Sequence, residues 1–249
     1  LLYGWSCATN EAIDLGLEIA KKLGGIFDGT MWICHGYSIY LAKKLGMGLP
    51  KLEEVLNNAD HVVFWGANPG DNHLRHMSRY AVFPRGERVP RGIETRMLSA
   101  VDIRMTSTVK VAMNKLLINP GGDAELLSAL ISELEGKPIQ REEVAGIPLK
   151  TFLEFVDVLK QRPYTAIFYG LGLTHSGKGK ENVELFYRLV QLLNQNGKSC
   201  IAMPMAGHYN MVGAVIKSLD AGGGPFAIDF GEGGEVARRG ESALDALLG

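Results

Sequence analysis

The chain has 249 residues, 46% of them hydrophobic, and a formal net charge of −1. This length is enough for one large or two small α/β domains with a sizeable core. The composition excludes a disordered chain, and the near-neutral charge is not typical of a nucleic-acid-binding protein. No apolar run reaches the roughly 18 residues that a membrane-spanning helix needs, so we expect no membrane span.

The number and spacing of the cysteines limit which disulfides and metal sites this chain can form. Cys7, Cys34 and Cys200 are too few and too scattered for a disulfide framework, and they fit a protein of the reducing cytoplasm. The sequence contains no CxxC pair, so this chain alone is not expected to build an iron–sulfur cluster or a structural zinc site. The sequence opens on the apolar residues Leu1–Gly4 without a methionine, and we expect it to be a fragment.

The first half of the chain alternates predicted strands and helices. A strand over residues 1–4 is followed by a helix over residues 10–23, with Ile13, Leu17, Ala20 and Leu23 on its apolar face. The further elements, in chain order, are a strand over 26–28, helices over 38–45 and 51–57, a strand over 61–65, a helix over 74–82, a strand over 97–101, an edge strand over 115–118 and a helix over 124–135.

The second half continues this alternation after a polar, turn-rich stretch over residues 136–148, which we interpret as a boundary or crossover. It comprises a helix over 149–159, a strand over 164–169, a helix over 181–194 and a strand over 199–203. The sequence after residue 222 is rich in glycine, which suggests a surface that a partner covers, and residues 244–248 could start a helix.

This alternation predicts an α/β fold made of two doubly wound, Rossmann-like units whose strand ends gather on one side. We expect the first unit to cover residues 1–145 and the second, incomplete unit to cover residues 146–249. A repeat protein is excluded, because the sequence has no internal period of about 20 to 50 residues.

Cys34 and His35 stand side by side between a predicted strand and a predicted helix. A thiolate at the N-terminus of a helix is stabilised by the helix dipole and is a soft ligand for a transition metal. A histidine beside it could move protons near neutral pH. The alternative is a buried, apolar cysteine next to a histidine that is hydrogen-bonded inside the core.

Two strands end in glycine-rich turns, Gly66–His73 after the strand over residues 61–65 and Gly170–Gly179 after the strand over residues 164–169. Open α/β sheets bind ligands at the carboxyl edge of their strands, where small residues let a ligand approach the backbone. One GxG is weak evidence, but its recurrence after a buried strand is stronger. The alternative is an ordinary strand-to-helix turn that needs glycine.

Polar residues follow a third strand, in the stretch Asp102–Thr108. An acid at a strand end can accept hydrogen bonds from sugar hydroxyls or from a guanine edge, while Arg and Thr side chains suit phosphates. The same residues could form a capped turn with an exposed ion pair. Likewise, Arg75, His76 and Arg79 could face a phosphate or simply water.

Four motifs occur in one order along the chain: Cys34-His35-Gly36, Gly66-Ala67-Asn68-Pro69, Asp102-Ile103-Arg104 and Gly207-His208-Tyr209-Asn210. On these motifs the chain resembles molybdopterin oxidoreductases of the formate dehydrogenase type. More narrowly, it resembles the B subunit of tungsten- or molybdenum-dependent formylmethanofuran dehydrogenase. The stretches Tyr3–Ser6, Arg75–Arg79, Phe83–Gly86, Glu143–Pro148 and Gly172–Ser176 extend the resemblance over nearly the whole chain.

The resemblance implies a role for individual residues. Cys34 matches the cysteine that ligates tungsten or molybdenum held by two molybdopterin guanine dinucleotides, and His35 matches the active-site histidine beside the metal. His208 is a further catalytic candidate. Gly66, Asn68 and His73 match the turn that holds one dinucleotide, with Asp102, Arg104 and Thr106 near its guanosine part. Gly170, Gly172, Thr174 and His175 match the turn for the second dinucleotide. The remaining candidates for cofactor binding are Gly4, Trp5, Gly207 and Asn210.

In enzymes of this family, carbon dioxide is reduced to formate at the metal, and the formate condenses with methanofuran in a separate amidohydrolase-type subunit. The resemblance therefore implies a cytoplasmic multisubunit complex with amidohydrolase-like A, C, pterin-capping D and ferredoxin-like subunits. It places any [4Fe-4S] cluster in a missing N-terminal segment or in partner subunits. It also implies the domain II–III type of the formate dehydrogenase fold.

The sequence departs from the family's pattern at several positions. Ala206 stands where the family has an arginine next to the metal, and alanine cannot hold a carboxylate by a bidentate contact. Tyr37 replaces a usual proline, Ile103 replaces another, and Gly177 follows Ser176 where an arginine is usual.

The alternative function is therefore a cofactor-poor structural B subunit of a formyltransferase/hydrolase complex. The retention of Cys34 and His35 argues against it. A nucleotide-binding α/β protein without a redox role is a third alternative.

Overall fold

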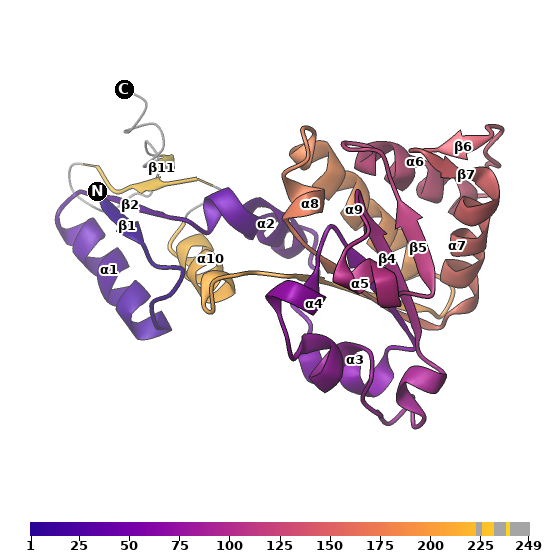
Figure 1. Cartoon of the computed structure of the whole chain (residues 1–249). Coiled ribbons are helices and arrows are strands. Elements are labelled where there is room, and N and C mark those ends of the chain that lie inside the picture. Colours follow the sequence, from indigo (N-terminus) through magenta and orange to yellow (C-terminus); the bar gives the residue numbers. More distant parts are fainter. Residues whose placement is uncertain (223–225, 232–237, 240–249) are drawn as a thin grey trace. The chain divides into compact units, whose positions relative to one another are not determined.

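A computed structural model describes residues 1–222, 226–231 and 238–239. The chain divides into two compact units (Figure 1): residues 1–47 together with the chain from residue 206, and residues 48–205. Residue 145, where the sequence suggested a boundary, lies inside the second unit, because the strands before and after it pair in one sheet. The helix expected over residues 244–248 and most of the glycine-rich sequence after residue 222 lie outside the described residues.

The second unit is built on a five-stranded parallel sheet with the order β5–β4–β3–β8–β9. Its strands are β3 (His61–Trp65), β4 (Met97–Asp102), β5 (Asn114–Leu117), β8 (Tyr164–Tyr169) and β9 (Ser199–Pro204). The strand order runs outward in both directions from β3 and β8, so this neighbouring pair forms a topological switch point. The expected α/β class is confirmed, but both glycine-rich turns follow strands of this one sheet rather than belonging to two units.

Helices cover both faces of this sheet (Figure 1). One face packs against α3 (Leu52–Asn58), the π-helix η2 (Met77–Ala81) and α5 (Ser107–Val111). The other packs against α6 (Asp123–Leu134), α7 (Leu149–Gln161) and α9 (Gly179–Leu193). Successive strand residues point to opposite faces. Phe64 packs on the face covered by α3, η2 and α5, whereas the ring centroid of Trp65 lies 6.5 Å from that of Phe186 in α9.

Short elements complete the second unit. They are α4 (Pro69–Asn72), the 3-10 helix η3 (Gly92–Glu94), the hairpin of β6 (Glu143–Val144) and β7 (Ile147–Pro148), and α8 (Leu171–Thr174). The helix expected over residues 74–82 is confirmed over Met77–Ala81, as the π-helix η2, but not at its start. Pro69 starts a short helix earlier, His73 leaves the helical conformation with φ of −132°, and η2 follows with the wider turn of a π-helix.

The first unit contains a smaller, mixed sheet with the order β1–β2–β10–β11. Its strands are β1 (Leu2–Gly4), β2 (Ile26–Gly29), β10 (Ile228–Asp229) and β11 (Arg238–Arg239). Its helices are α1 (Asn10–Lys22), the π-helix η1 (Trp32–Gly36), α2 (Tyr37–Lys44) and α10 (Met211–Asp220). Because β10 is antiparallel to β2, the described strands do not form the second doubly wound unit that the sequence suggested.

The first unit has its own core. Ile13 and Leu17 of α1 pack with Phe27 of β2 and with Met211 and Val215 of α10. The Thr9 hydroxyl accepts a hydrogen bond from the Ala12 N–H and begins α1 as an N-cap. Leu23, which the helical spacing placed on the buried face, is 77% exposed because α1 ends at Lys22.

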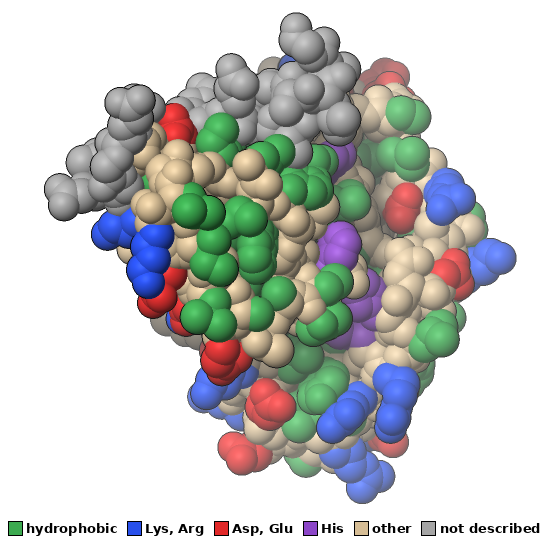
Figure 2. All heavy atoms as spheres, turned by 90° about the vertical axis from the view of Figure 1, so that its left-hand side faces the viewer, with side chains coloured by type: hydrophobic (Ala, Val, Ile, Leu, Met, Phe, Trp, Pro, Cys, Tyr) green, Lys and Arg blue, Asp and Glu red, His purple; other side chains and the backbone are tan. Residues whose placement is uncertain are grey.

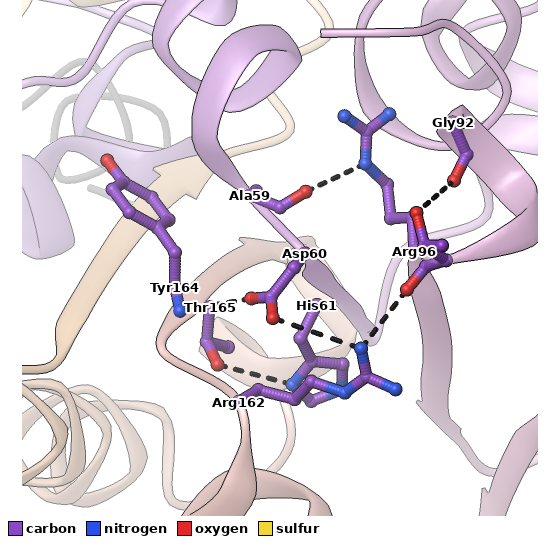
Figure 3. Close-up of polar contacts among 9 residues, drawn as sticks. Ala59, Asp60, His61, Gly92, Arg96, Arg162, Tyr164 and Thr165 are labelled. Carbon is purple, nitrogen blue, oxygen red and sulfur yellow. Dashed lines mark hydrogen bonds and ion pairs between the residues drawn. The ribbon is translucent and has the colours of Figure 1, made fainter. Parts of the chain in front are cut away.

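The amino-terminal edge of the five-stranded sheet carries a polar cluster (Figure 3). The Asp60 carboxylate accepts a hydrogen bond from the Tyr164 N–H at 3.0 Å. The buried His61 ring lies between the hydroxyl of Thr165, at 3.2 Å, and that of Ser99, at 2.8 Å. Burial lowers the pKa of His61 to about 3. This cluster is at the opposite edge from the glycine-rich turns and fixes the starts of β3 and β8.

Where the face in Figure 2 carries charged side chains, acidic and basic groups occur near one another. Such mixing fits the net charge of −1 and is not the continuous basic surface of a nucleic-acid-binding protein. No helix within the described part of the chain is both long enough and apolar enough to cross a membrane.

Candidate functional site

The two glycine-rich turns meet at the carboxyl edge of the sheet. The Gly66 N–H donates to the Val101 carbonyl at 2.8 Å, and the Gly172 N–H donates to the Gly66 carbonyl at 3.2 Å. A Cβ on Gly170 would lie 2.2 Å from the Gly66 oxygen, so this approach excludes a side chain. Gly66 also has a φ of +55°, which favours glycine. The structure brings both glycine-rich turns together at the switch point between β3 and β8.

A cavity of about 510 Å³ opens beside these turns. Its walls come from the ends of β3 and β4, the start of α6 and the α8 turn. They are Gly66, Asp102, Ile103, Pro120, Gly121, Asp123, Leu171, Gly172, His175, Ser176 and Gly177. Residues expected at two separate dinucleotide turns therefore line one cavity. Its volume lies within the range of about 300–1,000 Å³ that is usual for a single small-molecule ligand.

Asp123 is a wall residue that sequence reasoning did not single out. It is 3% exposed, and its carboxylate accepts from the Trp65 indole N–H at 2.7 Å and from the Ser176 hydroxyl at 2.9 Å. Ser176 in turn accepts from the Asn182 amide at 2.8 Å. Burial raises the pKa of Asp123, and these hydrogen bonds oppose that effect. An acidic residue directly after Gly121-Gly122, at a helix start, was the available signal in the sequence.

Asp102 and His175 reach the cavity from opposite turns. The Asp102 carboxylate closes its own turn by accepting from the Ile103 N–H at 2.7 Å and the Arg104 N–H at 3.3 Å. His175 is exposed, and its Nδ1 lies 2.8 Å from the Thr174 hydroxyl. Within the described part of the chain, the cavity walls contain no Lys or Arg, so Arg104 is not a wall residue.

Asn68 and Thr106 support the site from behind it. The Asn68 carbonyl oxygen accepts from the Ser107 and Thr108 hydroxyls, at 2.8 and 2.7 Å. The buried Thr106 hydroxyl accepts from the Val109 N–H and begins α5. Asn68 therefore joins the turn after β3 to the turn after β4, whereas Thr106 acts only within the second of these turns. His73, the third residue expected in the first turn, is not a wall residue of the cavity.

The second candidate centre lies in the first unit, around Cys34. The backbone N–H groups of His35 and Gly207 lie close enough to the Cys34 sulfur to favour the thiolate. Cys34 is the third residue of η1, which runs directly into α2. Burial raises the pKa of the Cys34 thiol, whereas the two amide groups oppose this change. Cys34 and the 207–210 motif, which the sequence had placed in different units, belong to the same unit.

The residues Gly4, Trp5 and Asn210 belong to the same group of loops. The Asn210 N–H donates to the Ser6 carbonyl at 3.1 Å, and its amide donates to the Ala8 carbonyl at 2.6 Å. Trp5 has a φ of 72°, an uncommon conformation for a side-chain-bearing residue, and stacks on Phe27 at 5.0 Å. Gly4, before it, has a φ of 128°. These contacts give Trp5 and Asn210 structural roles in the loop.

His35 and His208 differ in exposure. His35 is 1% exposed inside the unit, while Cys34 is partly exposed, so the neighbouring side chains face different surroundings. His208 is exposed beside Gly207. Ala206 and Cys34 both pack against the core of this unit.

The fit of a metal to Cys34 follows from its surroundings. The described residues form no group of three or more His, Cys, Asp or Glu side chains that could hold a metal ion. Cys34 could serve as one sulfur ligand of a metal whose other ligands belong to a bound cofactor. The partly exposed sulfur and its two amide donors fit that role.

No protein-family profile matches the chain. Its sequence is 38% identical over 248 residues to the B subunits of tungsten-containing formylmethanofuran dehydrogenase 2 from Methanococcus maripaludis and from Methanocaldococcus jannaschii. These matches cover 100% of this chain and 57% of each relative. The chain is a homologue of these B subunits. This similarity confirms the resemblance that the four sequence motifs indicate. The chain spans little more than half of the length of these relatives.

Two further proteins are similar to this B-subunit homologue. Protein YdeP of Escherichia coli K12 is 26% identical over 255 residues, which cover 82% of this chain and 34% of YdeP. A chain of the formyltransferase/hydrolase complex FhcABCD from Methylorubrum extorquens, solved with methylofuran, shares the fold with a TM-score of 0.68 and 20% identity. That match covers 99% of this chain and 63% of the solved chain, and it supports the fold alone.

Proposed function

We propose that the B-subunit homologue acts in a formylmethanofuran dehydrogenase-type complex that reduces carbon dioxide to formate for the formation of formylmethanofuran, or catalyses the reverse. The observation that carries this proposal is the meeting of Gly66, Gly172 and Asp102 around one cavity at the switch point of the sheet. Such a crevice is where open α/β sheets bind nucleotides. The full-chain similarity to B subunits of the tungsten enzyme supports this reading.

We assign the cavity to the guanosine part of one molybdopterin guanine dinucleotide. Asp102 and Asp123 would accept hydrogen bonds from the N–H groups of guanine or from ribose hydroxyls. Ile103, Pro120 and Leu171 offer apolar surface to a base. Because the walls lack Lys and Arg among the described residues, the phosphates would rely on backbone N–H groups or on other chains. Under this assignment both turns contribute to the site of this one dinucleotide.

We assign Cys34 as the sulfur ligand of tungsten or molybdenum. The bound metal–pterin group supplies the two-electron redox chemistry. The chain's contribution is to hold the thiolate, because the N–H groups of His35 and Gly207 stabilise negative charge on sulfur. His208, exposed on the adjoining loop, is the further catalytic candidate. Under this proposal the complex is cytoplasmic and brings amidohydrolase-like, pterin-capping and ferredoxin-like partners.

A second candidate function is a structural role, without cofactor, in a formyltransferase/hydrolase complex. Ala206 favours it, because alanine next to Cys34 cannot hold a carboxylate substrate. The absence of cationic groups from the described cavity walls favours it as well. Under this reading the glycine turns serve only the packing of β3 against β8.

Guanine release separates the two functions. The complex is purified natively through this chain, hydrolysed in acid, and assayed for guanine mononucleotide per chain. We expect about one equivalent of guanine mononucleotide per chain to be bound through this cavity. The double variant Asp102→Ala/Asp123→Asn should lose this equivalent, and the single variant Asp71→Ala should retain it. Asp71 is an exposed acid of the same sheet edge that does not line the cavity. No guanine in the native complex would favour the structural role.

A further inference from the structure

One exposed stretch of the second unit is strongly basic. Between residues 75 and 91 the sequence holds Arg75, Arg79, Arg85, Arg88 and Arg91, one acid, Glu87, and no lysine. All five arginines are exposed. The chain as a whole has a net charge of −1, so positive charge is concentrated here.

Four of these guanidinium groups are available for a partner. Arg91 pairs with Glu94 at 2.6 Å. Among the ion pairs of residues 1–222, 226–231 and 238–239, none involves Arg75, Arg79, Arg85 or Arg88. These four residues are called the arginine surface below. Arg79 lies over the Tyr80 ring at 5.1 Å, which orients its guanidinium group.

The backbone beneath the arginine surface is firmly held. The Arg79 N–H donates to the Arg75 carbonyl at 2.9 Å, which places these two side chains one helical turn apart. The Arg88 N–H donates to the Asn57 carbonyl at 2.8 Å. A Cβ on Gly86 would lie 2.0 Å from the Leu56 oxygen, so this turn packs directly on the end of α3. The arginines are therefore presented by an ordered backbone, which lowers the entropy lost on binding.

Apolar side chains are exposed among the arginines. Leu74 is 78% exposed and Phe83 is 48% exposed. Protein interfaces are enriched in arginine and aromatic residues and depleted of lysine, and their strongest contacts use the same residues. Surfaces that bind nucleic acid use lysine as well as arginine on their phosphate contacts. The composition of this stretch thus favours a protein partner.

We propose that the arginine surface, with Leu74 and Phe83, docks an acidic surface of another polypeptide of the complex. Arginine forms two parallel hydrogen bonds with a carboxylate, so Asp and Glu side chains of the partner would be held in a defined register. The inference rests on the proposed function only in that it requires a partner polypeptide.

The first test neutralises the surface. Arg75, Arg79, Arg85 and Arg88 are each changed to Gln in one variant of the natively purified chain. The control carries Lys110→Gln, Lys115→Gln, Lys150→Gln and Lys180→Gln, which are exposed, lie in the same unit and remove the same charge. We expect about a tenfold or greater loss of one co-purifying polypeptide per chain for the arginine variant, and no loss for the control. Circular dichroism checks that both variants fold.

The second test identifies the acidic surface directly. Single Arg79→Lys and Arg88→Lys variants keep the charge and introduce an amine that a zero-length carbodiimide couples to a carboxylate in contact with it. Mass spectrometry should find these positions joined to Asp or Glu of the polypeptide lost in the first test, with Lys110 and Lys150 unlinked to it. The proposal is overturned by unchanged subunit ratios, by crosslinks within this chain only, or by a loss of nucleic acid instead of polypeptide. Metal and guanine contents, measured on the same samples, report on the proposed function separately.

Discussion

Gly66 and Gly172 touch through their backbones: a Cβ on Gly172 would lie 2.7 Å from the Cα of Gly66 and 3.0 Å from its carbonyl oxygen. The two residues follow β3 and β8, which pair in parallel over all five residues of β3. Their contact brings the two turns of the cavity together, because no side chain separates them.

The first prediction concerns this contact. Gly172→Ala forces two backbone segments apart, so we expect a loss of about 1–3 kcal/mol in the free energy of unfolding and a loss of bound nucleotide. Gly177→Ala is the matched control, since a Cβ there meets nothing within 4 Å although Gly177 also lines the cavity. Urea unfolding of both variants measures the difference. Equal stability of the two variants would show that the turns are not in contact.

The second prediction concerns Arg96, which is 1% exposed and donates to four backbone carbonyls. Two of these acceptors, Ala59 and Leu56, lie at 2.8 and 2.7 Å, and the first of these contacts is drawn in Figure 3. Arg96→Met leaves the carbonyls without donors, so we expect a loss on the order of 3–5 kcal/mol.

The control for Arg96 is Arg91→Met, which removes an exposed arginine paired with Glu94. An exposed ion pair contributes at most about 1 kcal/mol. Guanidinium unfolding of the two variants should therefore give clearly different midpoints. Similar midpoints would contradict the role of Arg96 in holding the segment that carries the arginine surface.

Much of the five-stranded sheet follows from the sequence alone. The strands predicted over residues 61–65 and 164–169 match β3 and β8, because a short apolar run bounded by turn residues indicates a buried strand in an α/β chain. Their side-by-side pairing does not follow from local pattern, and neither does the meeting of the two turns that depends on it. For the same reason the sequence placed these turns in separate units.

Other elements were missed for local reasons. α4, α5 and α8 are only four or five residues long, too short for a helical period to show. α10 (Met211–Asp220) was not predicted, because the residues before it, 207–210, were interpreted only as a candidate site. At the candidate site, glycines and Asp102 were predicted from turn chemistry, whereas Asp123 depends on long-range contacts with Trp65 and Ser176.

The third prediction concerns pH and His61. Burial lowers the pKa of His61 to about 3, below the ordinary value of about 6.5, so the unfolded chain binds a proton that the folded chain excludes. The stabilisation is complete above about pH 6.5 and is lost as the pH falls toward 3. The free energy of unfolding of the wild type minus that of His61→Gln should therefore decrease over this window, by up to a few kcal/mol. A difference independent of pH would contradict the buried, neutral ring.

The fourth prediction concerns Asp123, whose pKa burial raises. A raised pKa means that the folded chain binds the proton more tightly than the unfolded chain, so stability decreases as the pH rises through the folded-state pKa. Relative to Asp123→Asn, the wild type should lose stability as the pH rises above the ordinary carboxyl range. Urea unfolding at a series of pH values gives this difference. An increase with pH would indicate a carboxylate stabilised in its charged form.

Metal content tests the account most directly. Tungsten and molybdenum are measured by elemental mass spectrometry on the natively purified complex, for the wild type, Cys34→Ala and Cys7→Ala. Cys7 is an exposed cysteine of the same unit and serves as the control. We predict about one metal per chain in the wild type and in Cys7→Ala, and loss of the metal in Cys34→Ala. A native complex without metal, or equal metal in all three proteins, would contradict the assignment of Cys34 as the ligand.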